Sequence, residues 1–398
     1  MDKLTISFSF FLEIVTFFFL FYFLVKNLKS FVEKHSINKT FLIILTSVKV
    51  LFLFLTLFYG VAGNALDSKS IYDMSTIFSE TLFISLKSGS VYGSEFMSLL
   101  IFPFTKLGKL SYVNLSIIFM LIGLYASLLF YVVLRKYSQN SYHHFLCMII
   151  ILYPTLNFFT SYITKDLIIF FLLSYLLFLL NFEYERKNFT IKLFLIAILI
   201  LFVRPYIFIT LATSSVIVFS IFNKFQKKNL ISFLTVLIIL TPLIFLLFIT
   251  KYNRVFEGSE NYFVQFLQYL DYRAEVTNIG DSKINLSTQN FYSKFIHILF
   301  GKNIFYLNFS NVFYFIDKIF LVFIFSHILL IKINLNKNKF NKYYLYEYSL
   351  LLYSVLLFVL LALSVSNYGI ALRLKLMFLP IFFYFIFKNI KIGQVKYK

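Results

Sequence analysis

The chain has 398 residues, of which 60% are hydrophobic and 14% are charged, and its mean hydropathy is +0.84. Soluble domains average about 45–50% apolar and about 25% charged residues, so this composition excludes an ordinary soluble fold. The net charge of +20 does not indicate nucleic-acid binding, because the lysines lie in short clusters between apolar runs. The single cysteine, Cys147, lies within an apolar run, which excludes disulfides within the chain and cysteine-based metal sites.

The apolar runs predict membrane-spanning helices. Several reach about 20 residues, which is the length of helix that crosses a hydrocarbon core of about 30 Å. They are continuously apolar, whereas the strands of a membrane barrel alternate between polar and apolar residues. We therefore predict an all-α polytopic protein that forms a single integral membrane domain, 1–398. Eleven spans are expected, at roughly 5–25, 41–61, 112–134, 145–160, 166–182, 190–203, 206–222, 230–250, 313–331, 343–363 and 376–390.

Lysine and arginine predict the orientation of these spans. Of the 37 basic residues, 20 lie in short connections on one side, and 15 are spread over longer segments on the other. The dense basic side is expected to be cytoplasmic, which places the N-terminus outside and the C-terminus inside. The richness in Phe, Ile, Lys and Asn is typical of a low-GC bacterial gene, so we predict a multi-pass protein of the bacterial cytoplasmic (inner) membrane.

Acidic residues point to the outer face as the place of any chemistry. Most of them lie in two outer segments, a first outer loop at 62–111 and a large outer loop at 251–312. Within the first loop, the stretch 96–108 is too short to cross the bilayer and contains Pro103, so we interpret it as re-entrant or interfacial. The sequence contains no P-loop, HExxH or GxSxG motif and no His/Cys cluster, so we expect no metal, no cofactor and no nucleotide-driven transport.

Two tight hairpins carry charges at their outer tips. One tip holds Arg204 before Pro205, and the other holds Lys165 and Asp166. Arg204 can snorkel to lipid phosphates, or its planar fork can bind a phosphate or sugar anion. Asp166 can cap the helix that begins there and complement its dipole. Alternatively, Lys165 lies over a pyrophosphate while Asp166 orients it or accepts a proton.

A third passage, 366–380, places Arg373 and Lys375 on the outer side, against the positive-inside trend. Arg373 and Lys375 can anchor the chain to lipid headgroups, which is a structural role, or they can contact an anionic substrate. In the first outer loop, Asp67 and Tyr72 are candidates for holding a sugar, because ring faces and carboxylates suit its apolar faces and hydroxyls. In the large loop, a surface helix at 262–276 is expected to act as a lid, and its candidate contacts are weaker: Arg254, Arg273 and Glu275.

Four passages together resemble bacterial surface-polysaccharide polymerases of the Wzy type and neighbouring GT-C-like membrane glycosyltransferases. They are YPTLNFFTSYITKD (153–166), FVRPYIF (202–208), SNYGIALRLKLMFLP (366–380) and, more weakly, LFGKNIFYLNFSNVFYFIDKIF (299–320). The third contains an N-x-G-x-x-x-R pattern that begins at Asn367. The sequence departs from the family pattern at Tyr206, where a histidine is usual, and at Phe158–Phe159, where a tryptophan-containing pair is usual.

The resemblance implies a reaction on undecaprenyl-pyrophosphate-linked oligosaccharides, in which a growing O-antigen or capsule glycan is transferred to the terminal sugar of another lipid-linked repeat. Lys165, Arg204, Arg373 and Lys375 would hold the pyrophosphate, and Asp67 or Asp166 would act as base. Membrane lipids, and a chain-length regulator, are the further partners that it suggests. Three alternatives remain: a GT-C transferase that adds one sugar from a polyprenyl phosphate, a polysaccharide-repeat flippase, and a membrane O-acyltransferase that uses His327.

Overall fold

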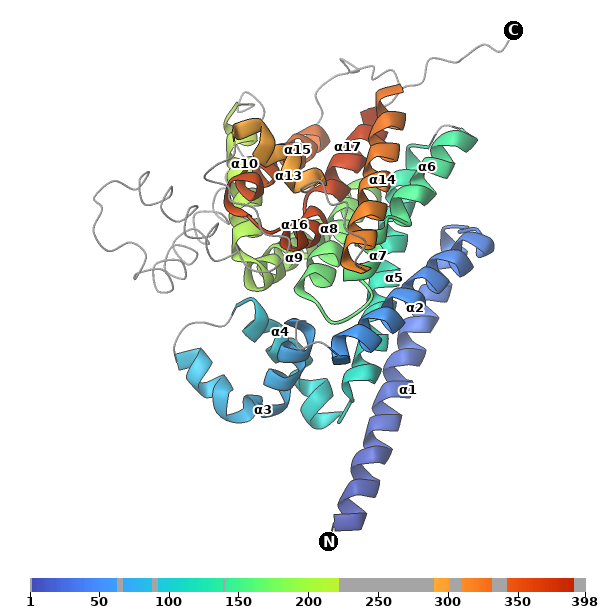
Figure 1. Ribbon diagram of the computed structural model, residues 1–398, viewed down its shortest axis with the longest axis vertical. Coiled ribbons are helices and arrows are strands. Elements are labelled where there is room, and N and C mark those ends of the chain that lie inside the picture. The colour runs from blue at the N-terminus through green and yellow to red at the C-terminus, as the bar shows by residue number, and fades with distance from the viewer. Residues whose placement is uncertain are drawn as a thin grey trace, which may run out of the picture. The chain divides into compact units, whose positions relative to one another are not determined.

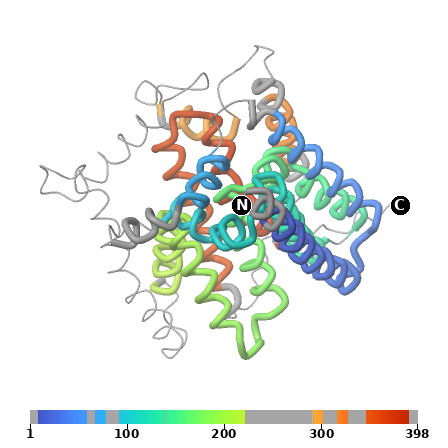
Figure 2. The backbone as a smooth tube through the Cα atoms, turned by 90° about the horizontal axis from the view of Figure 1, so that it is seen from below, coloured from blue at the N-terminus to red at the C-terminus, as the bar shows by residue number. Residues whose placement is uncertain are grey.

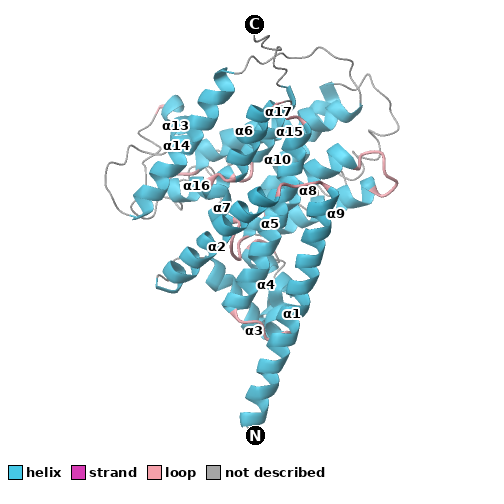
Figure 3. Ribbon diagram, turned by 90° about the vertical axis from the view of Figure 1, so that its right-hand side faces the viewer, coloured by secondary structure: helices cyan, strands magenta, loops and turns pink. Residues whose placement is uncertain are grey.

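The computed structural model describes residues 2–62, 67–87, 92–138, 140–221, 290–300, 309–330 and 342–389. All elements in these residues are helices, as Figure 3 shows, so the all-α prediction is confirmed for this part of the chain. The chain divides into two compact units, here called unit 1 (Met1–Arg204) and unit 2 (Pro205–Lys398). The predicted span 230–250 lies outside the described residues, as do the connection 223–229 and most of the loop 251–312.

Unit 1 contains the first helices of the chain (Figure 1). In chain order they are α1 (Asp2–Lys34), α2 (Lys39–Ala62), α3 (Asp67–Lys87), α4 (Ser94–Phe102), a π-helical turn η1 (Pro103–Leu107), α5 (Tyr112–Lys136), α6 (Ser141–Ile151), α7 (Pro154–Phe159), α8 (Lys165–Phe182) and α9 (Phe189–Val203). The short turn 35–38 joins α1 to α2 and can be followed in blue in Figures 1 and 2.

Small polar residues fix where several of these helices begin. Ser111, Asn140 and Thr164 are the N-caps of α5, α6 and α8, and each side chain accepts a hydrogen bond from a backbone N–H in the first turn. Pro154 occupies the first position of α7, where its missing N–H has no helical partner to lose. The same proline prevents α6 from continuing, so the predicted span 145–160 is two short helices instead of one.

Helix α3 replaces most of what the sequence suggested was a loop. Its 21 residues begin at Asp67, and apolar side chains recur at helical spacing, with Ile71 fully buried. Helix α3 packs against α4, and the Ser98 hydroxyl donates to the Ile71 carbonyl at 2.9 Å. The stretch predicted to be re-entrant is indeed helical and too short to cross, with a break at Pro103. Its position relative to a membrane stays a prediction.

The core of unit 1 lies between α5 and α8, both of which are buried over most of their length. Gly123 of α5 makes this packing possible. A Cβ at this position would lie 1.8 Å from the Thr160 carbonyl oxygen, so any larger residue would push the segment before α8 away. Close backbone approach of this kind is the reason that glycine is required inside an otherwise apolar helix.

Unit 2 is described by α10 (Pro205–Ile221), α13 (Phe291–Phe300), α14 (Phe309–Leu330), α15 (Lys342–Ser364), α16 (Tyr368–Lys375) and α17 (Leu379–Asn389). Helix α15 is the central element, because α10, α13 and α17 all pack against it. Helix α13 also packs against α16, and this contact builds the charged interior of the unit.

Several of the described helices have the length and composition of membrane spans. Five are long and apolar enough to cross a bilayer, or six if α16 and α17, which are bent by 44°, form one span. Three shorter apolar helices correspond to other predicted spans. On α1, Phe10, Phe11, Phe18 and Phe19 are each more than 60% exposed, as expected for side chains that face lipid. The total of eleven spans and the orientation of the chain stay predictions.

Candidate functional site

The two charged hairpin tips meet in unit 1. Arg204 Nη2 lies 2.5 Å from Asp166 Oδ1, and Lys165 Nζ donates to the Ser94 hydroxyl at 2.8 Å. We call these four residues, Ser94, Lys165, Asp166 and Arg204, the unit 1 charge cluster. Asp166 is fully buried and the Arg204 side chain is 14% exposed, so the cation is the more accessible partner. The structure thus joins two segments that are separated by 38 residues in the sequence.

Three helix ends hold this cluster in place. Lys165 and Asp166 form the first turn of α8, Arg204 follows the last residue of α9, and Ser94 begins α4. The Gly93 N–H donates to the Phe202 carbonyl at 2.8 Å, and the rings of Phe96 and Phe202 stack at 5.1 Å. The start of α4 is therefore tied directly to the end of α9.

Gly93 is needed at this junction because its φ is +69°, a region that favours glycine. A Cβ built on Gly93 meets no atom within 4 Å, so there is open space beside the first turn of α4. Backbone N–H groups at a helix N-terminus favour an anion. Together with Lys165 and Arg204, this geometry suits a phosphate.

The cap of α8 differs from the prediction. Thr164, and not Asp166, is the N-cap, and its hydroxyl accepts from the Leu167 N–H at 3.0 Å. Asp166 lies within the first turn, where its charge complements the helix dipole. Because the cap is already supplied, the Asp166 carboxylate is available for its ion pair with Arg204.

A buried lysine supports the segment that leads to the cluster. Lys49 of α2 is fully buried, and its Nζ donates to the Thr160 hydroxyl at 2.5 Å. The Thr164 hydroxyl donates to the Phe159 carbonyl at 2.8 Å. Residues 160–164 are all buried. This segment is therefore a fixed support for Lys165 and Asp166.

The sugar-binding candidates of the first outer segment lie on α3. Asp67 is exposed at the first residue of this helix. Tyr72 is half-buried, its hydroxyl donates to the Leu110 carbonyl at 3.0 Å, and its ring packs edge-on against Tyr112. Burial, together with the charges of Glu13 and Asp73, raises the pKa of Tyr72. The Tyr72 hydroxyl thus has a structural partner within this part of unit 1.

Lys375 lies in a second buried cluster, in unit 2. Its Nζ donates to Asp317 Oδ2 at 2.9 Å, to the Leu299 carbonyl at 2.5 Å and to the Tyr368 hydroxyl at 3.1 Å. Both Lys375 and Asp317 are fully buried, so the ion pair joins α16 to α14 inside the unit. Since Leu299 is in the last turn of α13, Lys375 also satisfies a carbonyl at the negative end of that helix.

His297 and Lys318 complete this group. Lys318 lies over the Tyr368 ring at 5.8 Å, and the centroid of the His297 ring is 6.0 Å from that of Tyr368. Burial, then the charges of Lys375 and Lys318, lower the pKa of His297 to about 4. We call His297, Asp317, Lys318, Tyr368 and Lys375 the unit 2 charge cluster.

The other predicted residues of unit 2 have varied positions. Asn367 is the N-cap of α16 and accepts from the Ile370 N–H at 3.3 Å. Arg373 is half-buried on the same helix. The Tyr206 hydroxyl donates to the sulfur of Met377 at 3.3 Å. Asn367 and Tyr206 thus have structural partners. Three further candidates, Arg254, Arg273 and Glu275, lie outside the described residues, and so does the side chain of His327.

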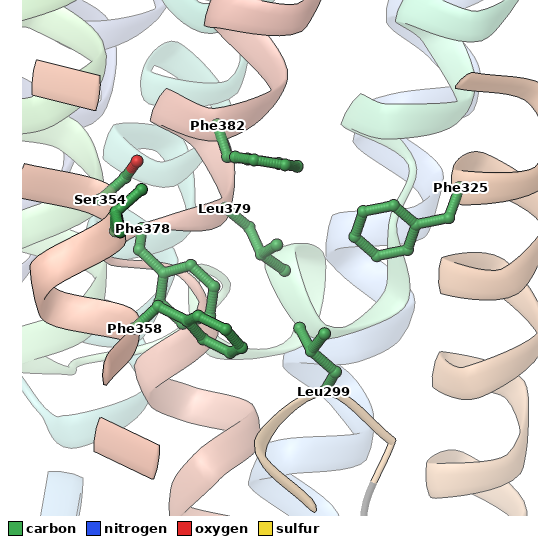
Figure 4. Close-up of a pocket in the computed structure, with 8 residues that line it drawn as sticks. Leu299, Phe325, Ser354, Phe358, Phe378, Leu379 and Phe382 are labelled. Carbon is green, nitrogen blue, oxygen red and sulfur yellow. The ribbon is translucent and has the colours of Figure 1, made fainter. Parts of the chain in front are cut away.

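An apolar cavity of about 140 Å³ lies within unit 2 (Figure 4). Four phenylalanines contribute to its wall, and its one hydroxyl, on Ser354, already donates to the Leu351 carbonyl at 2.8 Å. Val355, which is 45% exposed, also lines the cavity, so the cavity reaches the surface of the described part. The lining comprises Leu299, Phe325, Ser354, Val355, Phe358, Phe378, Leu379 and Phe382.

Sequence reasoning missed His297, Ser94 and Gly93. A histidine in an apolar ten-residue segment gives no sign that two lysines from distant helices will surround it. Ser94 and Gly93 resemble ordinary turn residues until α9 is brought beside them. In the part of the chain that the structure describes, no three His, Cys, Asp or Glu side chains are placed to hold a metal ion.

No protein-family model matches the sequence, and neither a curated protein nor a solved structure is significantly similar to it.

Proposed function

We propose that the chain is a membrane glycosyltransferase that polymerises undecaprenyl-pyrophosphate-linked oligosaccharide repeats into a surface polysaccharide. The observation that carries this proposal is the unit 1 charge cluster. It brings Lys165 and Arg204 together at the ends of three helices, beside open space at Gly93. The proposed setting is the outer face of the bacterial cytoplasmic membrane, with the N-terminus outside and the C-terminus inside.

The cations of this cluster suit a pyrophosphate leaving group. Arg204 presents a planar fork that can donate two parallel hydrogen bonds to phosphate oxygens, and Lys165 adds a compact positive charge. Cations that are already in position stabilise the negative charge that develops on the leaving oxygen as the glycosidic bond breaks. Their positions are fixed by buried supports, Lys49 beneath Thr160 and Phe202 beside Gly93, so little reorganisation is needed.

The transfer step follows from these roles. The hydroxyl oxygen of the acceptor sugar forms a bond to the anomeric carbon of the donor glycan. The bond from that carbon to the pyrophosphate oxygen breaks, and its electron pair leaves with the lipid pyrophosphate. Arg204 exchanges Asp166 for the phosphate, and the freed carboxylate accepts the hydroxyl proton. Asp67 is the alternative base, because it is exposed at the start of α3.

The lengths of the glycans that cells make, resolved as a ladder of repeat numbers, test the proposal. We expect deletion of the gene to leave a single repeat unit on the carrier lipid, because repeats are still made and exported but not joined. Expression of Arg204→Ala or Lys165→Ala in the deletion strain should give the same product while the protein still inserts in the membrane. Arg186→Ala, which removes an exposed arginine of the α8–α9 connection, is the matched control and should restore the full ladder.

Other outcomes would favour the alternatives. If deletion leaves no repeat unit on the outer face, the chain is a flippase or an early transferase. If the product lacks one sugar but is still polymerised, it is a single-sugar GT-C transferase. Normal ladders from both Arg204→Ala and Lys165→Ala would refute the polymerase proposal, because it requires both cations at the leaving group.

A further inference from the structure

His297 is a buried polar side chain whose hydrogen-bonding capacity is unused. Only 2% of the residue is exposed, and neither ring nitrogen has a hydrogen-bond partner among the residues that the structure describes. Folded proteins rarely keep an unsatisfied buried polar group without a use for it, because no hydrogen bond replaces the water that the group loses on burial. The histidine is not there to close a gap in the helix, because a leucine would fill the same space without that cost. The unpaired ring therefore points to a ligand that the unit binds.

The surroundings of His297 indicate that this ligand is an anion. Lys375 and Lys318 both lie close enough to disfavour protonation of the ring. Among the described residues of unit 2 the acids are Asp317 and Glu347, and Glu347 belongs to a separate pair with Lys388. The cluster thus contains two ammonium groups, those of Lys318 and Lys375, and one described carboxylate, that of Asp317. A neutral histidine beside them can donate its N–H to an oxyanion, whose charge the ammonium groups would offset.

The apolar cavity of Figure 4 lies beside the same last turn of α13. The Leu299 carbonyl accepts the Lys375 hydrogen bond, while the Leu299 side chain lines the cavity. A cavity of about 140 Å³ with this lining offers a water molecule almost no polar partner, and dry apolar cavities of similar size take up small hydrocarbons. The last turn of α13 therefore joins a cationic cluster to a space suited to hydrocarbon.

We propose that the unit 2 charge cluster is a second oxyanion site, which binds the phosphate of a lipid whose hydrocarbon chain enters the Phe-lined cavity. Naming that lipid rests on the proposed function. Joining two lipid-linked repeats requires one donor and one acceptor, and each carries a pyrophosphate. The unit 1 charge cluster serves one of them, and His297 with Lys318 and Lys375 serves the other.

Counting bound ligands tests this inference without catalysis. The full chain, purified in detergent, is titrated with farnesyl pyrophosphate, and native mass spectrometry counts the molecules bound. We expect two on the wild type. His297→Leu and Lys318→Gln should each weaken one site by about tenfold or more, the usual effect of losing a hydrogen bond or charge at an anion. Lys187→Gln, which removes an exposed charge from the α8–α9 connection, should leave both sites intact.

The two variants also separate a ligand site from a structural role. His297→Leu removes only unpaired nitrogens, so we expect it to leave thermal stability unchanged or higher. A single farnesyl pyrophosphate on the wild type, or two on both variants, would overturn the inference. Inorganic pyrophosphate that competes at the second site as strongly as farnesyl pyrophosphate would overturn the assignment to a lipid. The glycan ladder of Arg204→Ala tests the proposed function separately, so either idea can fail while the other stands.

Discussion

Removing Lys375 should destabilise unit 2 far more than removing the whole ion pair. In Lys375→Leu, the carboxylate of Asp317 stays buried in a site that is 0% exposed and loses the ammonium group that donates to it at 2.9 Å. Breaking a buried pair in this way costs about 3–5 kcal/mol. The Leu299 carbonyl also loses its donor, which adds about 1 kcal/mol. In Lys375→Leu/Asp317→Leu neither charge of this buried pair remains, so we expect most of the loss to be recovered, to within about 2 kcal/mol of the wild type.

The assay is unfolding of the purified chain in mild detergent as the fraction of denaturing detergent rises, followed by circular dichroism. Wild type, both single variants and the double variant form a cycle that isolates the coupling between the two residues. Lys294→Leu, which removes a half-buried lysine of α13, is the matched control for a lysine lost from the same unit. If Lys375→Leu costs less than about 1 kcal/mol, or the double variant is as unstable as the single one, the cluster is not the buried pair described above.

Three further predictions concern the supports of the two clusters. Gly123→Ala should prevent normal folding, because its Cβ would lie 1.8 Å from the Thr160 carbonyl oxygen. Ala126→Gly on the same helix should be tolerated. The yield of detergent-soluble protein measures the effect of both variants. Thr164→Ala should cost about 1 kcal/mol through loss of the α8 cap, and an unchanged unfolding midpoint would contradict that role. Lowering the pH from about 6.5 to about 4 should reduce the free energy of unfolding by roughly 1.4 kcal/mol per pH unit. The pKa of His297 is lowered to about 4 in the folded chain, so the unfolded state binds the proton first. His297→Leu should remove the share of this pH dependence that comes from the histidine. If the melting temperature falls equally with pH in the wild type and in His297→Leu, the prediction is wrong.

Much of the fold follows from the sequence because lipid imposes simple rules. Apolar runs of about 20 residues predicted the positions of α1, α2, α5, α8 and α15, and Arg204-Pro205 predicted the boundary between α9 and α10. Helix α3 was missed because its polar composition resembled an outer loop, although Ile71 and its neighbours follow helical spacing. In this segment the spacing of the apolar residues predicts the secondary structure better than the number of charged residues does.

The candidate site was predictable residue by residue, but its geometry was not. The hairpin tips drew attention to Lys165, Asp166 and Arg204, since charges at apolar boundaries are costly and conspicuous. Nothing in the sequence shows that Arg204 pairs with Asp166, because that contact depends on how α8 and α9 pack. Lys375 was expected to contact lipid headgroups or an anionic substrate, and the structure pairs its buried ammonium group with Asp317. A lysine that is conspicuous in the sequence can therefore serve a buried ion pair as well as a ligand.

Product formation by the purified chain tests the central claim most directly. The protein is reconstituted in lipid vesicles with an undecaprenyl-pyrophosphate-linked repeat, and products are resolved by length while released undecaprenyl pyrophosphate is counted. Wild type and Arg186→Ala should yield a ladder, with one lipid pyrophosphate released for each new linkage. With Arg204→Ala the single repeat should remain unjoined, because new linkages form at least about a hundredfold more slowly. A loss of this size is expected when a group that stabilises the charge on the leaving group is removed. A full ladder from Arg204→Ala at the wild-type rate would contradict the account.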